Sequence, residues 1–190
     1  MKKKLLDTAM DLFSRYGYED VSVDMICKHC NVTKGSFYYH YLSKDSLLSE
    51  YYTINTNNDL TDLLIKMIDI KDPLEKLWKI AGYYPEQNNL LNPSLNMHLM
   101  VANMEHGGKL YPVLIDNIIA YYSEVSNVLK KVTEEGQSQG IIKNEYDWGQ
   151  LFELYCAAFH GLLVEWSATD GSFDLMERIY QYFLMIYKKN

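Results

Sequence analysis

Residues 22–47 read SVDMICKHCNVTKGSFYYHYLSKDSL, and this stretch decides the fold. It predicts two short helices joined by a tight turn. Ser22 and Thr33 belong to the residue types that cap helix N-termini, and Asn31 tolerates the left-handed conformation that can end a helix. A rigid helix end with small, basic and phenolic side chains can be accepted by a DNA groove and its flanking phosphates. The stretch therefore predicts a DNA-binding helix-turn-helix.

The second of these helices is expected to have a buried side and an outward side. With Phe37 pointing inward, Tyr41 lies near the same side one turn later. Val32, Ile26 and Cys30 are expected to complete the buried side. The residues then expected to face outward, or to flank the outward side, are Gly35, Ser36, Tyr38, Tyr39 and His40.

Each polar residue of the stretch also has a purely structural interpretation. Lys34 and Lys44 could pair with phosphates, and Ser22 and Thr33 could bind phosphate while they cap their helices. Singly, each is more often a cap or a solvated lysine. A glycine in an early helical turn, as at Gly35, costs about 1 kcal/mol relative to alanine. Its presence would be explained if another backbone approaches closely there, or if a glycine is simply tolerated near a helix end. As one set in register, these residues favour DNA binding.

The pattern extends on both sides of this stretch. It comprises Ala9, Leu12, Phe13, Gly17, Tyr18, Ser22, Val23, Ile26, the run 32–41, Ser43, Lys44 and Leu47. Over residues 3–50 it resembles the N-terminal domain of the TetR family of transcriptional regulators. Asn31 replaces the turn glycine that is usual in that family, and Cys27 and Cys30 stand where alanines are common.

The resemblance implies an all-helical homodimer. We expect a repressor that binds a palindromic DNA operator and is released from it by a small-molecule effector. One helix of each copy would enter the major groove, and the last helices would form a four-helix interface. Residues 1–47 would form the DNA-binding domain, and residues 48–190 an effector-binding and dimerisation domain. Contacts with the DNA backbone are implied for Ser22, Thr33, Tyr39, His40 and Lys44. The residues implied to lie nearest the bases are Lys34, Gly35, Ser36 and Tyr38.

The acidic balance of the chain, with a net charge of −7, argues at first against a nucleic-acid partner. Residues 1–50 hold seven basic and seven acidic side chains, whereas residues 51–190 hold eleven and eighteen, so the whole excess lies in the second part. Between Met25 and Lys44 there is no acidic residue. Such a locally positive face can still attract phosphate, because exposed charges are screened beyond roughly 8 Å at physiological salt.

Apolar residues recur with helical periodicity throughout, which predicts an all-α fold of about nine helices. A first helix is expected to end at Gly17, and Gly136–Gly140 should mark a break. Two longer helices are expected near residues 147–167 and 173–188. Proline stands at a plausible first helical position in Asp72-Pro73, Asn92-Pro93 and Tyr111-Pro112.

The last two helices are apolar on more than one side. A surface helix needs only one apolar stripe, so two stripes imply that the helix is buried on both sides. One interpretation is that both sides are buried within a monomer. We favour a homodimer interface, because these helices end a chain too short to surround them fully. The residues expected in this interface are Leu154, Ala158, Gly161, Leu162, Met176, Tyr180, Phe183 and Tyr187.

Aromatic, methionine and histidine residues of the body could line a cavity for a small apolar or aromatic effector. Each of them could equally well fill the core, and the expectation of a pocket rests mainly on the resemblance. A regulator controlled by a protein partner, without a small ligand, is the alternative. The candidate ligand-binding residues are Trp78, Tyr83, Met97, His98, Met100, Met104, Tyr155 and Phe159.

Other functional classes find little support. Cys27 and Cys30 form a Cys-x-x-Cys motif, but their helical spacing with Val23 and Ile26 marks them as core residues, and a structural zinc needs four converging ligands. We therefore expect no metal or cofactor. The chain has no nucleophile elbow, P-loop, dinucleotide fingerprint or His-Glu-x-x-His motif, which argues against an enzyme. Its least polar run, Leu154–Val164, is eleven residues long, whereas a membrane span needs about 20. A cytoplasmic protein without a membrane partner is expected.

Overall fold

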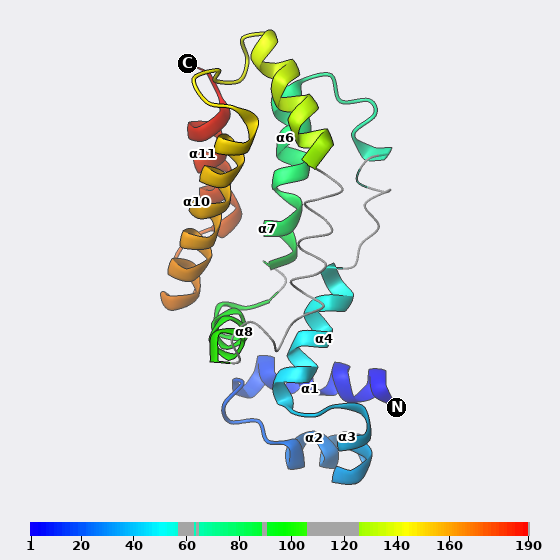
Figure 1. The fold of residues 1–190 in the computed structure, drawn as a ribbon. Coiled ribbons are helices and arrows are strands. Elements are labelled where there is room, and N and C mark those ends of the chain that lie inside the picture. The colour runs from blue at the N-terminus through cyan, green and yellow to red at the C-terminus, as the bar shows by residue number, and fades with distance from the viewer. Residues whose placement is uncertain (57–62, 64, 89–90, 106–125, 190) are drawn as a thin grey trace.

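A computed structural model describes residues 1–56, 63, 65–88, 91–105 and 126–189. Within these ranges the chain is built from helices, which Figure 1 shows. They are α1 (Lys2–Tyr16), α2 (Val23–Cys30), α3 (Lys34–His40), α4 (Lys44–Thr56), α6 (Pro73–Ala81), α7 (Tyr83–Asn88), α8 (Pro93–Glu105), α10 (Trp148–Ala168) and α11 (Leu175–Tyr187). A further helical segment covers residues 126–138. The predicted all-α fold, with a small N-terminal unit followed by a larger helical body, is confirmed.

The N-terminal helices begin and end where the sequence places them. Ser22 Oγ and Thr33 Oγ1 each accept a hydrogen bond, at 3.2 Å, from the backbone N–H three residues later. Gly17 follows α1 with φ 83°, and Asn31 follows α2 with φ 55°. Both values lie in the left-handed region, which glycine and asparagine tolerate better than other residues. The tight turn before α3 is therefore set by local chemistry.

The N-terminal unit and the body each bury an apolar cluster. In the N-terminal cluster, helices α1 to α4 surround Phe37 and Leu47, which are both completely buried. Leu91, Leu95 and Leu99 from the start of α8 and the residues before it join this cluster. Figure 1 shows α8 lying above α1 at this junction. The body therefore supplies part of the core on which the N-terminal unit rests.

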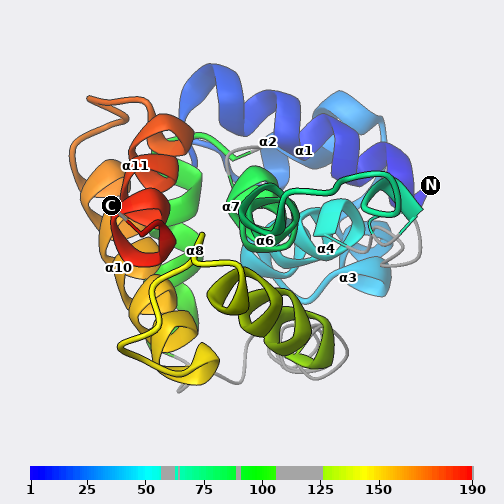
Figure 2. The ribbon, with the colours of Figure 1, turned by 90° about the horizontal axis from the view of Figure 1, so that it is seen from above.

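The body is an elongated bundle whose last two helices lie side by side and antiparallel (Figures 1 and 2). Tyr155 of α10 and Ile179 of α11 are among the buried residues of its core. The C-terminal end is tied to the loop before α10 by two backbone hydrogen bonds of 2.9 Å. One joins Lys143 N–H to the carbonyl of Tyr187, and the other joins Lys189 N–H to the carbonyl of Ile141.

The prolines at the starts of α6 and α8 occupy the predicted positions. Asp72 caps α6 by accepting the N–H of Leu74 at 2.8 Å, and Asn92 accepts the N–H of Leu95 at 2.8 Å. The third expected start, at Tyr111-Pro112, lies outside the described residues. None of the helices within the described ranges is both long and apolar enough to cross a membrane.

The predicted break at Gly136–Gly140 needs a correction. Gly140, with φ 71°, follows the end of the helical segment 126–138, but Gly136 lies inside it. A Cβ atom added to Gly136 would lie 2.5 Å from Cδ1 of Ile142, which is completely buried. Gly136 is therefore needed for the close approach of two segments, and it does not end the helix.

Candidate nucleic-acid interface

Helices α2 and α3 form the end of the molecule that lies away from the C-terminal helices (Figure 1). Phe37 holds α3 in place, because it is completely buried and its ring lies 5.9 Å from that of Tyr41 between centroids. Tyr41, Ile26 and Cys30 are each at most 3% exposed, and Val32 packs against the same cluster. The predicted buried side of the second helix is thereby confirmed.

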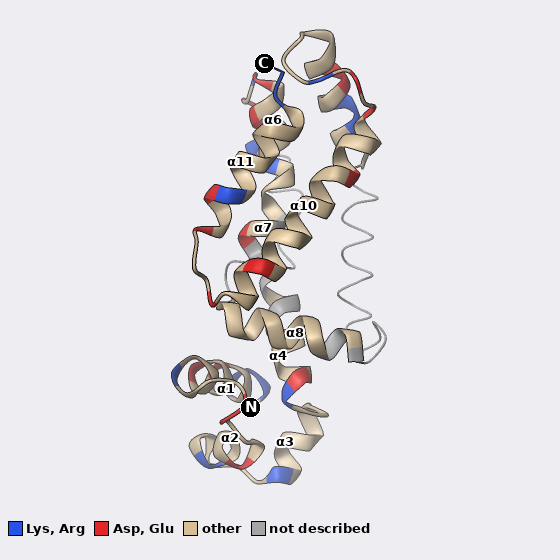
Figure 3. Cartoon of the chain, turned by 90° about the vertical axis from the view of Figure 1, so that its left-hand side faces the viewer, with Lys and Arg blue, Asp and Glu red and all other residues tan. Residues whose placement is uncertain are grey.

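The opposite side of α3 is open. Tyr39 is 85% exposed and Tyr38 is 53% exposed, while Ser36 and His40 are half-buried. A Cβ atom added to Gly35 would meet only Thr33 Oγ1, at an ordinary 3.7 Å. Packing against described residues therefore does not require glycine at position 35. Figure 3 shows basic positions on both α2 and α3 at this end of the molecule.

Lys34, at the start of α3, is paired within the chain. Its Nζ lies 2.8 Å from Oδ2 of Asp24 in α2, and both side chains are more than half exposed. The hydrogen bond to Asp24 and the charge of that carboxylate raise the pKa of Lys34. Sequence reasoning missed this pair, because Asp24 stands just before the acid-free interval. A phosphate or base acceptor would have to share Lys34 with this carboxylate or replace it.

Lys44 also has a contact within the chain. Its Nζ donates a hydrogen bond of 2.8 Å to the carbonyl of Tyr18 and lies 4.3 Å from the centroid of the Tyr18 ring. Ser43 caps α4, because its Oγ accepts the N–H of Ser46 at 3.2 Å. Since an ammonium group has three donors, this contact leaves N–H groups of Lys44 for other acceptors. Lys44 thus holds the start of α4 against the loop that follows α1.

Tyr18 connects the helix-turn-helix to the body. Its hydroxyl donates to Asp45, and its ring lies 4.9 Å from that of Phe13 and 4.7 Å from that of His98 in α8. His98 Nδ1 lies 3.4 Å from Oε1 of Glu19. We expected His98 to line the effector pocket, but it contacts the loop after α1 instead. The reason is that α8 packs across the N-terminal cluster.

The other residues predicted for an effector pocket have different surroundings. Tyr155 and Phe159 are both 3% exposed and belong to the body core, and the Tyr155 hydroxyl donates to the carbonyl of Ala81 at 2.9 Å. Met104 is 74% exposed on α8. Tyr155 and Phe159 are therefore packed in the core and Met104 lies on the surface, and none of these three side chains lines the hollow between α1 and α4 or the one between α6 and α11. The half-buried candidates are Trp78, Tyr83, Met97 and Met100.

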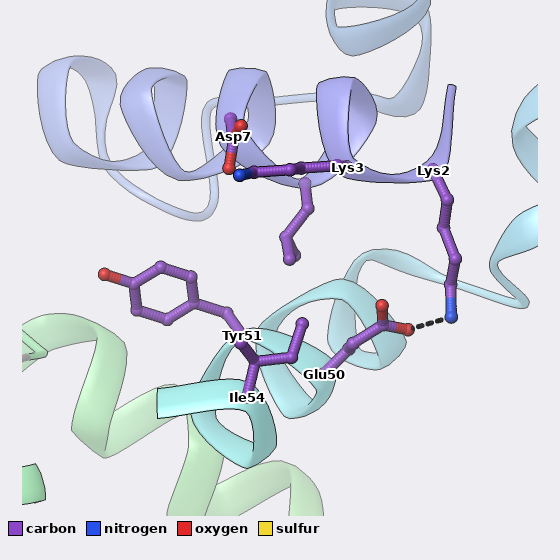
Figure 4. A pocket seen from close by; sticks show the side chains of 7 residues that line it. Lys2, Lys3, Asp7, Glu50, Tyr51 and Ile54 are labelled. Atoms are coloured by element: carbon purple, nitrogen blue, oxygen red, sulfur yellow. Dashed lines mark ion pairs between the residues drawn. The ribbon is translucent and has the colours of Figure 1, made fainter. Parts of the chain in front are cut away.

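One open hollow, of about 550 Å³, lies between α1 and α4 (Figure 4). At its edge Lys2 forms an ion pair of 2.5 Å with Glu50, and Figure 4 shows Lys3 extended toward Asp7. The charges along these walls therefore compensate one another. The residues that line it are Lys2, Lys3, Leu6, Asp7, Glu50, Tyr51 and Ile54.

A second hollow, of about 270 Å³, lies between α6 and α11. It brings together one residue expected in the effector pocket, Trp78, and two expected in the homodimer interface, Tyr180 and Phe183. The sequence could not predict this juxtaposition, because nearly a hundred positions separate the two helices. The remaining lining residues are Asp72, Leu74 and Glu75.

Three residues predicted for the homodimer interface are buried in the core of this chain. Leu162 is 5% exposed, Phe183 0% and Tyr187 1%. Apolar residues lie on more than one side of α11, so their spacing could not tell which side faces the body. The structure buries the side that includes Ile179, Phe183 and Tyr187. The prediction is corrected at these three positions. The half-buried or exposed members of the predicted set are Leu154, Ala158, Gly161, Met176 and Tyr180.

An apolar outer face nevertheless exists on the last two helices. Leu154 and Val164 of α10 are 52% and 46% exposed, and Tyr182 and Met185 of α11 are 41% and 59% exposed. Figure 3 shows that most positions along these helices are uncharged. A Cβ atom added to Gly161 would meet nothing within 4 Å, so α10 is open at that point.

Cys27 and Cys30 are buried in α2, as their spacing predicts. Burial raises the pKa of the Cys27 thiol, which opposes formation of a reactive thiolate. Across the described ranges, no three His, Cys, Asp or Glu side chains are grouped so that they could hold a metal ion.

Residues 5–51 match the protein-family model described as "Bacterial regulatory proteins, tetR family". The chain is also similar to the biofilm operon icaADBC HTH-type negative transcriptional regulator IcaR of Staphylococcus epidermidis. The two are 29% identical over 148 residues, which cover 69% of this chain and 74% of that protein. The similarity therefore continues beyond the helix-turn-helix.

Two solved structures share the fold. A transcriptional regulator from Saccharomonospora viridis, in complex with choline, has a TM-score of 0.64 and 18% identity, covering 100% of this chain and 98% of that one. Thermus thermophilus FadR, a TetR-family repressor in complex with lauroyl-CoA, has a TM-score of 0.60 and 14% identity, covering 98% of this chain and 93% of that one. At these identities the likeness shows the fold alone.

Proposed function

We propose that this chain, which belongs to the TetR family of helix-turn-helix transcriptional regulators, is a homodimeric repressor that a small-molecule effector releases from a palindromic operator. DNA binding and transcriptional regulation follow from membership of the family, which consists of regulators and not of enzymes. Repression, the homodimer and the effector are the proposed part. The negative regulator IcaR and the repressor FadR support the proposed sign of regulation.

The observation that carries the proposal is the presentation of α3. Phe37 is completely buried while Tyr39, two residues later, is 85% exposed, so one side of this short helix is fixed and the other is free. That side can enter the major groove and contact base edges. The proposed contacts to the DNA backbone are Ser22, Thr33, Tyr39, His40 and Lys44. Those proposed nearest the bases are Lys34, Gly35, Ser36 and Tyr38.

The homodimer is proposed to form through the outward faces of α10 and α11. Leu154 and Met185 are more than half exposed there, and Gly161 leaves room for another helix. A two-fold pair would present two copies of α3 to half-sites about 34 Å apart. The proposed division of labour assigns DNA binding to residues 1–47 and effector binding and dimerisation to residues 48–190. Helix α4 runs through that boundary and joins the two parts.

Release by an effector requires a connection between body and helix-turn-helix, and α8 provides one. Leu95 and Leu99 pack in the N-terminal cluster, and the ring of His98 packs against that of Tyr18. An effector that favours a different position of α8 would therefore also move Tyr18, and the spacing of the two α3 helices with it. That proteins of this fold are found with choline and with lauroyl-CoA supports a small-molecule effector.

A genome-wide pull-down of bound DNA tests this function. It should recover a palindromic sequence, and sedimentation of the purified protein with that duplex should give two chains per duplex. Small molecules suggested by the neighbouring genes should then raise the melting temperature of the protein and release it from DNA. Recovery of no common sequence, or one chain per duplex, would contradict the proposal. Ligands that never shift the melting temperature would favour control by a protein partner.

A further inference from the structure

The hollow between α6 and α11 has aromatic walls. The rings of Trp78 and Tyr180 lie 4.8 Å apart between centroids, and their planes are tilted by 55°. Phe183, completely buried and 5.1 Å from Trp78 between centroids, closes the floor. Trp78 is half-buried and Tyr180 is 38% exposed, so both rings keep surface that a bound molecule can reach.

Two carboxylates stand at the rim of these aromatic walls. Glu75 precedes Trp78 by three residues in α6, which places both on one side of the helix. Asp72 uses Oδ1 to accept the N–H of Leu74 and retains its second oxygen. Within the described ranges, neither Asp72 nor Glu75 has an ion-pair partner within 4 Å, and none of the six lining residues is basic. The hollow therefore combines π faces with two carboxylates that form no ion pair among the described residues.

We propose that this hollow binds a small organic cation of the alkylammonium class. The faces of tryptophan and tyrosine attract cations that come within about 6 Å of the ring centroid, and this is how proteins recognise quaternary ammonium groups. A hard metal ion would need a shell of oxygen ligands, which aromatic walls do not supply. A neutral apolar molecule would take the carboxylates out of water without compensating their charge.

The size and the electrostatic environment of the hollow fit such a ligand. Its volume of about 270 Å³ lies below the roughly 300–1,000 Å³ of sites for drug-sized molecules, so the cation is small. The two carboxylates at the rim are the charged groups closest to a ligand bound in the hollow, because both belong to its lining. The hollow shares no residue with α3, so the proposal stands independently of the DNA-binding function. It assigns Tyr180, whose ring lies against Trp78 of α6, to the hollow and not to the homodimer interface.

Choline and 3,3-dimethylbutan-1-ol test the proposal, because they have nearly the same shape and differ by the exchange of N⁺ for carbon. Each is titrated calorimetrically into the full chain, and saturation transfer by NMR reports contacts between protein aromatic protons and ligand methyl protons. We expect choline to bind one site per chain, at least about tenfold more tightly than the alcohol, with transfer to its methyl groups. No saturable binding of choline, or equal affinity for both compounds, would overturn the proposal.

Variants then locate the site. Asp72→Asn combined with Glu75→Gln removes both charges while asparagine still caps α6, and it should weaken choline at least tenfold but leave the alcohol unchanged. Glu86→Gln is the matched control, because Glu86 is an exposed carboxylate on α7 outside the hollow. It should leave choline affinity unchanged. Equal losses of choline affinity in the double variant and in Glu86→Gln would indicate a general charge effect. They would contradict the assignment of the binding site to this hollow.

The aromatic walls have their own test. Trp78→Leu should weaken choline at least tenfold, and Tyr180→Leu provides the same test at a more exposed position if the first variant fails to fold. Choline binding that survives every change in the hollow would place the site elsewhere in the molecule and end the proposal.

Discussion

The N-terminal unit and the body differ in what decides the orientation of their side chains. In α3, burial of Phe37 determines that Tyr38 and Tyr39 face outward, and caps within a few residues set the helix ends. In α11, apolar residues lie on more than one side, and only packing against the rest of the body decides that Phe183 is buried and Tyr182 exposed. Local rules therefore determine the proposed DNA-binding surface, whereas tertiary packing determines the surfaces of the body.

The largest expected effect comes from the residue that anchors α3. Phe37→Ala should lower the free energy of unfolding by about 3–5 kcal/mol, because it empties a completely buried site. Tyr39→Ala, at an exposed position of the same helix, should change it by less than about 0.5 kcal/mol. Denaturant unfolding of the full chain measures both. Similar losses of unfolding free energy in the two variants would show that α3 is not held in place by its buried side alone.

Two glycines of the body should respond in opposite ways. Gly136→Ala should lower the free energy of unfolding by about 1–3 kcal/mol, because its Cβ would overlap buried Ile142. Gly161→Ala should stabilise the single chain by up to about 1 kcal/mol through helix propensity, since no neighbour lies within 4 Å. If α10 meets a second copy there, Gly161→Ala should also weaken the homodimer in sedimentation. An unchanged homodimer would refute the proposed close approach.

A smaller effect is expected at the turn between α2 and α3. Asn31 adopts φ 55°, so Asn31→Gly should raise the free energy of unfolding by roughly 0.5–1 kcal/mol and Asn31→Ala should lower it by about 1 kcal/mol. Thermal unfolding distinguishes these outcomes. If the Asn31→Ala variant were as stable as Asn31→Gly, the turn would not depend on a residue that tolerates the left-handed conformation. Local sequence would then not explain the fold of the N-terminal unit.

The smallest effect concerns the charge of Lys34. Asp24→Asn removes its partner, so binding to non-operator DNA should tighten by about two- to fivefold, with a salt dependence steeper by about one counterion. Fluorescence anisotropy at several salt concentrations measures both quantities. Asp20→Asn is the control, because this exposed acid of the same unit belongs to none of the described ion pairs. An equal gain with Asp20→Asn would show a general charge effect.

The N-terminal unit could be predicted from sequence because its determinants lie within a few residues of one another. Ser22, Thr33 and Asn31 act on the backbone next to them, and the buried side follows from the position of Phe37. The pairing of Lys34 with Asp24 was missed although both residues lie in the same stretch, because the pair forms between two helices.

The body could be predicted only in outline. The contact of His98 with Tyr18 depends on how α8 crosses the N-terminal cluster, and no periodicity encodes that crossing. Gly136 resembles a helix break in sequence and becomes a packing residue only when Ile142 is brought against it. The hollow lined by Trp78 and Tyr180 likewise exists only because α6 and α11 are neighbours in space.

The central claim is that the exposed side of α3 is the DNA-reading surface, and the operator affinity of two tyrosine variants tests it most directly. Tyr39→Ala removes a side chain that is 85% exposed on α3, and Tyr146→Ala removes one that is 54% exposed in the body. We predict that the first variant loses at least about fivefold in affinity with its unfolding free energy unchanged, and that the second binds as tightly as the wild type. Undiminished operator binding by Tyr39→Ala, together with weakened binding by Tyr146→Ala, would contradict the account.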